Sequence, residues 1–303
     1  MTGSTELRTQ EQIRDLSDVP SFPAVYAAAL DPRSRRGRVR GEAVLPSVAY
    51  RVRQVRIDAE RARDFDHLMG GPATDLVHPG VLHVLAFPIS LALMARRDFP
   101  FALLGLVHVR NQVLQHRPVR VGELVDVECR VRDLRPHHKG RTFEAVSTIL
   151  GGDGEIIATD VSTYLVRGGG EPSSRARRDF APPRPTGRWR LAADVGRRYA
   201  AVAGDVNPIH MSALSAKAFG FPRAIAHGMY TASRAFTESR VDLSRPLRWD
   251  VSFDAPVTLP GSVLVAYEDD PASGSVHCVG WRAGRGDKGP RRCFEVQVTT
   301  LER

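Results

Sequence analysis

Hydrophobic periodicity divides the chain into two similar series of elements. In the first series, a partly alternating strand over 47–58 and a helix over 59–69 precede an apolar helix, Gly80–Met94, that Pro88 is expected to interrupt. Alternating segments bounded by glycine, proline and charged turns then predict strands at 101–114, 123–134, 142–150 and 155–166.

The second series repeats this order. Short helices are predicted from Arg197 to Ala203 and from Ser212 to Phe219, followed by a small-residue, apolar central helix over 224–240. Strands follow near 247–255, 262–269, 276–283 and 293–301. A long helix followed by several strands predicts an antiparallel sheet wrapped around that helix, so residues 46–167 and 188–303 are read as two α+β units.

The segments outside these units differ in composition. Residues 1–45 are polar, with three spaced prolines and a basic run at 33–38, and we expect a loosely packed leader. Residues 168–187 combine glycine, proline, serine and arginine, which indicates a linker able to cross between the two units.

The clearest chemistry lies between the two short helices of the second unit. In Gly204-Asp205-Val206-Asn207-Pro208-Ile209-His210, a carboxylate and an imidazole are five residues apart around a turn that Asn207-Pro208 stiffens. Histidine titrates near neutral pH, so Asp205 and His210 are candidates for an acid/base pair. Turn formation alone would also explain Asp205 and Asn207, and the surrounding residues decide in favour of the pair.

The segment from Tyr199 to Phe236 resembles the signature of the MaoC-like, R-specific enoyl-thioester hydratases. That signature is an aromatic residue, a Gly-Asp-x-Asn-Pro-hydrophobic-His core and a later His-Gly-Met, here His227-Gly228-Met229. Over roughly residues 45–301 the arrangement resembles the double-hot-dog members of this family, of actinobacterial type. The resemblance implies a double hot-dog fold in which an antiparallel sheet wraps around two central helices.

The same resemblance implies reversible hydration of trans-2-enoyl thioesters to (3R)-hydroxyacyl thioesters in fatty-acid metabolism. Asp205 and His210 would hold one water; His210 removes a proton as the oxygen attacks C3, and Asp205 delivers a proton to C2. The backbone N–H of Gly228, at a helix start, would bind the thioester oxygen. The expected substrate-binding residues are Asn207, His227 and Tyr230, with a supporting or packing role left open for His227.

The first unit lacks the Asp-x-Asn-Pro-x-His pattern. Its counterpart of His227-Gly228-Met229 is predicted at Ala86-Phe87-Pro88, where Phe87 would block close approach of a backbone N–H to the substrate. We expect this half to be catalytically inert and infer that it shapes an apolar tunnel for acyl tails longer than four carbons. The alternative is that it only stabilises its neighbour.

Charge and residue composition indicate which binding partners and cofactors to expect. The net charge of +9 comes from arginine, because Lys139, Lys217 and Lys288 are the only lysines. A basic balance suits polyanions, but no basic-aromatic motif points to nucleic acid, and the resemblance favours coenzyme A phosphates or an acidic acyl carrier protein. Cys129, Cys278 and Cys293 are too sparse for a disulfide framework, and the histidines show no metal-ligand spacing, so neither a metal nor another cofactor is expected.

The sequence also bears on cellular location and on alternative functions. No segment approaches the roughly 18 apolar residues of a membrane span and no signal pattern is present, so a cytoplasmic protein is expected. Pairing of two chains into a homodimer is left open. A hot-dog acyl thioesterase and a non-catalytic acyl-thioester binding protein remain as alternative functions.

Overall fold

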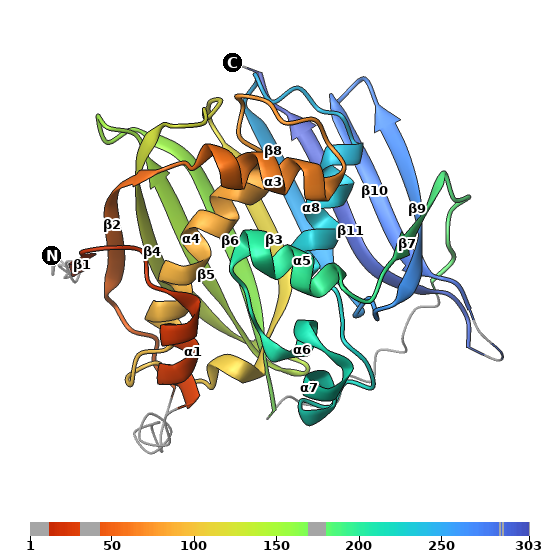
Figure 1. The fold of residues 1–303 in the computed structure, drawn as a ribbon, viewed down its shortest axis with the longest axis horizontal. Coiled ribbons are helices and arrows are strands. Elements are labelled where there is room, and N and C mark those ends of the chain that lie inside the picture. The colour runs from red at the N-terminus through yellow and green to blue at the C-terminus, as the bar shows by residue number, and fades with distance from the viewer. Residues whose placement is uncertain (1–11, 31–42, 169–179, 285, 287, 303) are drawn as a thin grey trace, which may run out of the picture.

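The architecture is a single large sheet with helices on one face. A computed structural model describes residues 12–30, 43–168, 180–284, 286 and 288–302. An 11-stranded sheet runs through both halves of the chain in the order β1-β2-β4-β5-β6-β3-β8-β11-β10-β9-β7. The helices lie together across one face of this sheet (Figure 1).

Apart from the short edge strand β1 (Ile13–Leu16), the two halves have the same strand order when counted from each outer edge inward. The first half contributes β2 (Ala49–Arg56), β4 (Leu124–His137), β5 (Gly140–Leu150), β6 (Ile156–Arg167) and β3 (Leu106–Gln115). The second half contributes β7 (Gly187–Leu191), β9 (Gly261–Asp270), β10 (Ser275–Arg282), β11 (Arg291–Thr300) and β8 (Leu247–Phe253). Every predicted strand is present within a few residues, whereas β1 and β7 were not predicted.

The seam between the halves is a pair of hydrogen-bonded strands. β3 and β8 run antiparallel, with partners from Arg110↔Ser252 to Gln115↔Leu247. Buried side chains from both halves belong to one connected hydrophobic core. Backbone bonding and side-chain packing therefore hold the halves as one body, and the domain boundaries drawn from composition stay predictions.

Two central helices pack on the sheet, α4 (Pro79–Met94) and α8 (Gly228–Glu238). In α4 every residue except Phe87 and Ala92 is buried. The predicted interruption at Pro88 is wrong, because α4 continues through it; packing on all sides outweighs one lost backbone hydrogen bond. The predicted helical start at residue 224 is also too early, since Ile225 bridges to Thr258 in extended conformation.

The symmetry of the fold corrects the predicted counterpart of His227-Gly228-Met229. Leu76 bridges to Arg120 as Ile225 bridges to Thr258, and two residues later His78 and His227 are the extended N-cap residues of α4 and α8. His78-Pro79-Gly80 is therefore the true counterpart, and Ala86-Phe87-Pro88 lies inside α4.

This correction gives a better reason for the prediction that the first half is catalytically inert. The position of Gly228, the first residue of α8, is taken in α4 by Pro79, which has no backbone N–H. The next N–H, of Gly80, donates to His78 Nδ1 at 2.8 Å. The first half thus offers no equivalent free donor at its helix start.

The N-terminal segment is packed, contrary to the expectation of a loose leader. β1 (Ile13–Leu16) pairs in parallel with β2, and α1 (Phe22–Leu30) contacts α4, with Val25 only 6% exposed. Apolar residues on α1 give it a surface to bury. The basic run at 33–38 and residues 169–179 of the predicted linker lie outside the described residues.

The remaining helices lie near the seam or beside the second-half site. They are α3 (Ala59–Met69), the short 3-10 helix η1 (Leu103–Gly105), α5 (Val195–Ala203), α6 (Pro208–Met211) and α7 (Ala213–Ala218). The expected lack of a disulfide framework is confirmed, since all three cysteines are buried and unpaired. Within the ranges that the structure describes, no helix is long and apolar enough to cross a membrane.

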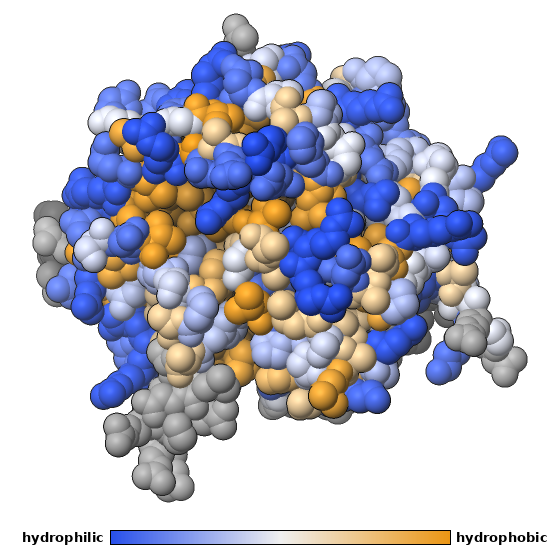
Figure 2. Space-filling view, viewed as in Figure 1, coloured by the Kyte–Doolittle hydropathy of each residue, from blue (hydrophilic) through white to orange (hydrophobic). Residues whose placement is uncertain are grey.

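Arginine is spread over the molecular surface. On the helical face a hydrophilic patch covers α5, whose Arg197 and Arg198 are exposed (Figure 2). Other arginines pair with carboxylates, for example Arg51 with Asp15 at 2.7 Å. Part of the positive charge is therefore neutralised locally.

Burial of His78 makes the stability of the fold depend on pH. Burial lowers its pKa from 6.5 to about 3, so between these values the unfolded chain binds a proton that the folded chain does not. The stability that depends on neutral His78 is complete above pH 6.5 and is lost as the pH falls toward 3.

We therefore predict that His78→Phe flattens the acid limb of stability. The unfolding free energy of the unmodified protein should fall relative to the variant by about 1 kcal/mol per pH unit between pH 6 and pH 4. Chemical denaturation at several pH values measures this difference. A difference that does not change with pH would contradict a buried, neutral His78.

Candidate active site

The loop after α5 brings Asp205, His210 and His227 together. A nitrogen or carboxylate oxygen from each side chain lies within 4.8 Å of the others. The loop begins at Gly204, whose left-handed backbone (φ 79°) ends α5. The two residues predicted as an acid/base pair are therefore neighbours in space.

His210 presents one basic nitrogen. Its Nδ1 lies 2.8 Å from the carbonyl oxygen of Ile225, and because a carbonyl can only accept, Nδ1 carries the proton and Nε2 is free to act as a base. Burial lowers the pKa of His210, opposed by the charge of Asp205 and by the Ile225 hydrogen bond. The imidazole is therefore neutral near pH 7.

Asp205 is held mainly through one carboxylate oxygen. Its Oδ1 accepts from the Tyr26 hydroxyl at 2.9 Å and from the Asn207 N–H at 3.1 Å. His227 Nε2 donates to the backbone carbonyl of Asp205 at 3.0 Å and lies 3.6 Å from Oδ2. These contacts fix the carboxylate and leave Oδ2 as the oxygen available for proton transfer.

Tyr26 is the site residue that sequence reasoning missed. It lies on α1, 179 residues before Asp205 in the chain. Burial raises the pKa of Tyr26, and the nearby Asp205 carboxylate raises it further, so the hydroxyl stays protonated and donates. No local motif marks this residue; only the apolar character of 22–30 could have indicated that the segment packs.

His227 supports the pair from behind. Its ring stacks on the His210 ring with centroids 3.7 Å apart. Burial lowers the pKa of His227 well below its usual value, and the adjacent His210 lowers it further, so this ring is neutral as well. Its Nε2 donates to the backbone carbonyl of Asp205, which positions the loop, while its buried Nδ1 has no hydrogen-bond partner among the described residues, so a substrate-binding role for His227 stays a prediction.

Gly228 offers a backbone donor. As the first residue of α8 its N–H has no acceptor inside the helix. A Cβ at this position would lie 3.0–3.2 Å from the ring of Phe253, so the tight approach of that ring favours glycine here. The donor, the base and the carboxylate belong to one compact loop and helix start.

Asn207 and Tyr230 are placed less directly. Asn207 is the N-cap of α6, and its side-chain oxygen accepts from Ile209 N–H at 3.3 Å, which fixes the loop. Tyr230 packs on Tyr199, which in turn contacts His227, and it lines a separate cavity of about 340 Å³ between α3, α5 and α8. A substrate-binding role for either residue stays a prediction.

The side chains of Asp205, His210 and His227 could in principle bind a metal, although none is expected from the sequence. Histidine nitrogens and a carboxylate are also the donor types of zinc sites. Two of the four ring nitrogens already bond to backbone carbonyls, which fits an organic acid/base site well. The absence of a metal stays a prediction.

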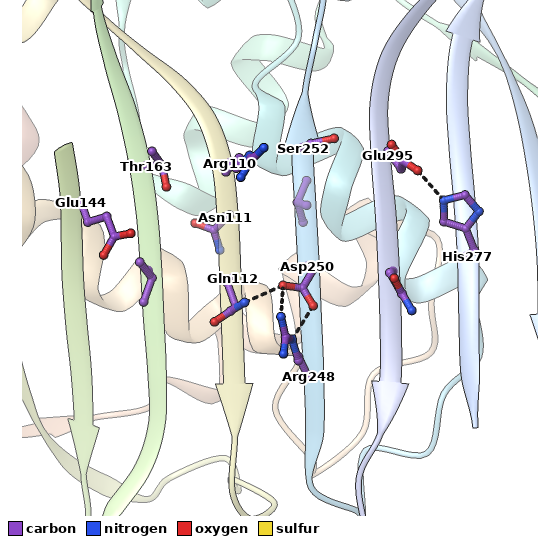
Figure 3. Close-up of a pocket in the computed structure, with 13 residues that line it drawn as sticks. Arg110, Asn111, Gln112, Glu144, Thr163, Arg248, Asp250, Ser252, His277 and Glu295 are labelled. Carbon is purple, nitrogen blue, oxygen red and sulfur yellow. Dashed lines mark hydrogen bonds and ion pairs between the residues drawn. The ribbon is translucent and has the colours of Figure 1, made fainter. Parts of the chain in front are cut away.

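A larger cavity lies on the opposite face of the sheet. It has a volume of about 430 Å³ and is lined by side chains from the strands around the seam, with the helices behind them in Figure 3. Its polar groups largely pair with each other: Gln112 Nε2 donates to Asp250 at 2.6 Å, and His277 lies 2.8 Å from Glu295. The sheet separates this cavity from the Asp205 loop.

Comparison with known proteins identifies the family. Residues 175–270 match the family described as MaoC like domain. The chain is also 33% identical over 225 residues to 3-hydroxyacyl-thioester dehydratase X of Mycobacterium tuberculosis, covering 72% of this chain and 79% of that protein. The chain belongs to the MaoC-like dehydratase family. It is therefore an enzyme, a dehydratase of the hydro-lyase class.

Solved structures agree with this membership. The crystal structure of HtdX of Mycobacterium tuberculosis matches with a TM-score of 0.70 at 29% identity, over 84% of this chain and all of that one (100%). A MaoC-like dehydratase from Phytophthora capsici matches with a TM-score of 0.66 at 17% identity, over 88% of this chain and 97% of that one, and shows the fold alone. The predicted double hot-dog fold is confirmed.

Gly196 on α5 generates a first prediction for the site. A Cβ there would lie 2.1 Å from the backbone oxygen of His210, so Gly196→Ala must push α6 away from α5. We expect turnover to fall about 100-fold, because displacements of about 1 Å have such effects on catalytic geometry. Steady-state kinetics measures the turnover, with Gly105→Ala as control, because a Cβ at Gly105 would meet no other part of the described chain within 4 Å. Equal turnover in the two folded variants would contradict the packing argument.

A second prediction concerns Tyr26→Phe. Loss of the hydroxyl donor to Asp205 should lower turnover about tenfold, the usual scale for one hydrogen bond to a charged or polar partner. Tyr50→Phe is the matched control, because Tyr50 is also buried and its hydroxyl accepts from Arg96 at 3.0 Å away from the site. A Tyr26→Phe enzyme as active as the control would remove Tyr26 from the site.

Proposed function

We propose that this dehydratase catalyses the reversible hydration of trans-2-enoyl thioesters to (3R)-hydroxyacyl thioesters. The observation that carries the proposal is the placement of a neutral His210, the Asp205 carboxyl group and the Gly228 N–H in one loop and helix start. The related dehydratase from Mycobacterium tuberculosis is named for 3-hydroxyacyl thioesters, which supports the same substrate class here.

The Asp205/His210 pair shares one catalytic proton in the proposed mechanism. Hydration starts with His210 neutral. His210 Nε2 removes a proton from water as the oxygen bonds to C3. His210 passes this proton to Asp205 Oδ2, which delivers it to C2, so that one water is added in total and both groups return to their starting states; dehydration is the same sequence reversed.

The arrangement of hydrogen bonds suits this proton transfer. Oδ1 of Asp205 is occupied by two donors, Tyr26 and Asn207, so the mobile proton belongs on Oδ2. Nδ1 of His210 is tied to Ile225, so the exchange uses Nε2. Each group therefore has one atom for anchoring and another for chemistry.

Negative charge develops on the thioester oxygen while C3 is attacked. The Gly228 N–H, at the positive end of the α8 dipole, is the proposed donor to this oxygen. Pro79 at the equivalent position of α4 supports a single reaction site in the second half. The thioester would be carried by coenzyme A or by an acyl carrier protein, with no further cofactor.

An absorbance assay tests the proposal. Purified protein mixed with crotonyl-coenzyme A should remove the absorbance of the conjugated enoyl group, and chiral separation should give the 3R product. Asp205→Asn and His210→Ala should each lower turnover by roughly 100- to 10,000-fold, the range for a lost general acid or base.

Controls separate this function from its alternatives. His116→Ala changes an exposed histidine next to β3 and should keep full turnover. Release of free thiol would indicate a thioesterase. A 3S product, or wild-type turnover in a folded Asp205 or His210 variant, would refute the proposed mechanism.

A further inference from the structure

A second group of buried polar side chains lies in the first half, between α4 and the sheet. His83 Nδ1 donates to Asp160 Oδ2 at 2.6 Å, and Asn111 donates to the other carboxylate oxygen at 2.9 Å. Ser162 donates to Asn111 at 2.8 Å. All four residues are at most 5% exposed, and the proposed mechanism uses none of them.

His108 joins this group with an unsatisfied nitrogen. Its ring stacks on those of His83 and Tyr164, with centroids 6.0 and 5.0 Å away. Its Nε2 is buried and has no hydrogen-bond partner in the part of the chain that the structure describes. An unpaired buried polar group costs about 1–3 kcal/mol, so this nitrogen is suited to a partner from outside the protein.

Burial sets the charge of this nitrogen. It lowers the pKa of His108 to about 3, with the adjacent His83 as the next cause. The ring is therefore neutral at physiological pH, and Nε2 can either donate or accept depending on the tautomer. A hydroxyl group, which does both, is a suitable partner in either case.

Ring contacts connect His108 to the active site. The Phe253 ring lies against Gly228, where a Cβ would be 3.0 Å away, and its centroid is 5.1 Å from that of His108. Two steps through van der Waals contact therefore lead from the proposed oxyanion donor to the unsatisfied nitrogen.

A parallel path runs along α4 and α1. Phe22 lies against Gly204 at the start of the catalytic loop, and its ring centroid is 5.7 Å from Phe87, which is 5.5 Å from His83. Phe22, Phe87, His108 and Phe253 are each partly exposed residues. Their ring contacts form an aromatic wall that begins beside Gly204 and Gly228 and ends at the His83–Asp160 pair.

We propose that His108, backed by the His83–Asp160 pair, is a polar subsite that binds a hydroxyl group on the acyl chain of the substrate beyond C3. The inference rests on the proposed function for the identity of the ligand. It changes the picture of a purely apolar tunnel, because α4 contributes Phe87 to the wall but also His83. The acyl chains that fit best are therefore oxygen-bearing ones.

Equilibrium binding tests the subsite without depending on turnover. Calorimetry would compare octanoyl-coenzyme A with four saturated analogues that carry one hydroxyl at C5, C6, C7 or C8. At least one hydroxylated analogue should bind the unmodified protein about tenfold more tightly than octanoyl-coenzyme A, the gain expected when a buried polar group finds its partner.

Substitutions at His108 test whether the preference for a hydroxylated ligand depends on this residue. His108→Phe keeps an aromatic ring without the nitrogen and should abolish the preference, with His108→Leu as a second variant should the first not fold. His116→Phe makes the same change at an exposed position just beyond β3 and should keep the preference.

The binding and hydration results together distinguish failure of the subsite from failure of the proposed function. Equal binding of all five ligands, or a preference that survives in the folded His108 variants, overturns the subsite. Hydration of crotonyl-coenzyme A without a preference refutes the subsite and keeps the proposed function. A preference without hydration refutes the proposed function and keeps the binding site.

Discussion

Six backbone pairs between β3 and β8 fix the position of one half of the molecule against the other. The catalytic loop belongs to the second half, but the groups around it come from both. His108 lies on β3 and Phe253 on β8, so the contact between them crosses the seam directly. A slip of one residue in this pairing would turn the side chains of one strand to the opposite face from those of its partner and separate His108 from Phe253.

The two halves differ chemically at equivalent helix starts. His78 and His227 have nearly the same backbone conformation, yet His78 accepts the Gly80 N–H and stays within the core, whereas His227 bonds to the Asp205 backbone. Pro79 leaves the start of α4 without a backbone N–H at that position, whereas Gly228 provides one at the start of α8. The duplicated architecture is thus compatible with the one reaction centre proposed, because the first half lacks both the Asp-x-Asn-Pro-x-His pattern and the N–H at its helix start.

Local patterns were sufficient for most of the fold. Strand alternation and the motif from Gly204 to His210 are properties of short segments, and the structure has both where they were expected. The interruption at Pro88 was wrong because propensity says nothing about how completely α4 is packed. The misplaced counterpart of His227 had a similar cause, since only the bridges of Leu76 and Ile225 reveal the true alignment.

The site was predicted only as far as the motif extends. Asp205, His210 and Gly228 are close in sequence or follow a recognisable pattern, whereas Tyr26 and His108 reach the site by long-range packing. Such contacts depend on the topology of the fold, and no local motif in a single sequence marks the residues that make them. The roles of Asn207 and Tyr230 stay predictions for the same reason.

The bond from Tyr26 to Asp205 also bears on how the enzyme is made. It joins residues 179 positions apart, so the Tyr26 hydroxyl cannot donate to Asp205 until the second half has been synthesised and folded, although α1 already has α4 to pack on. Contacts of this kind close a long loop and form late, because the chain entropy they restrict is large. The complete set of hydrogen bonds that fixes the Asp205 carboxylate is therefore acquired only in the finished chain.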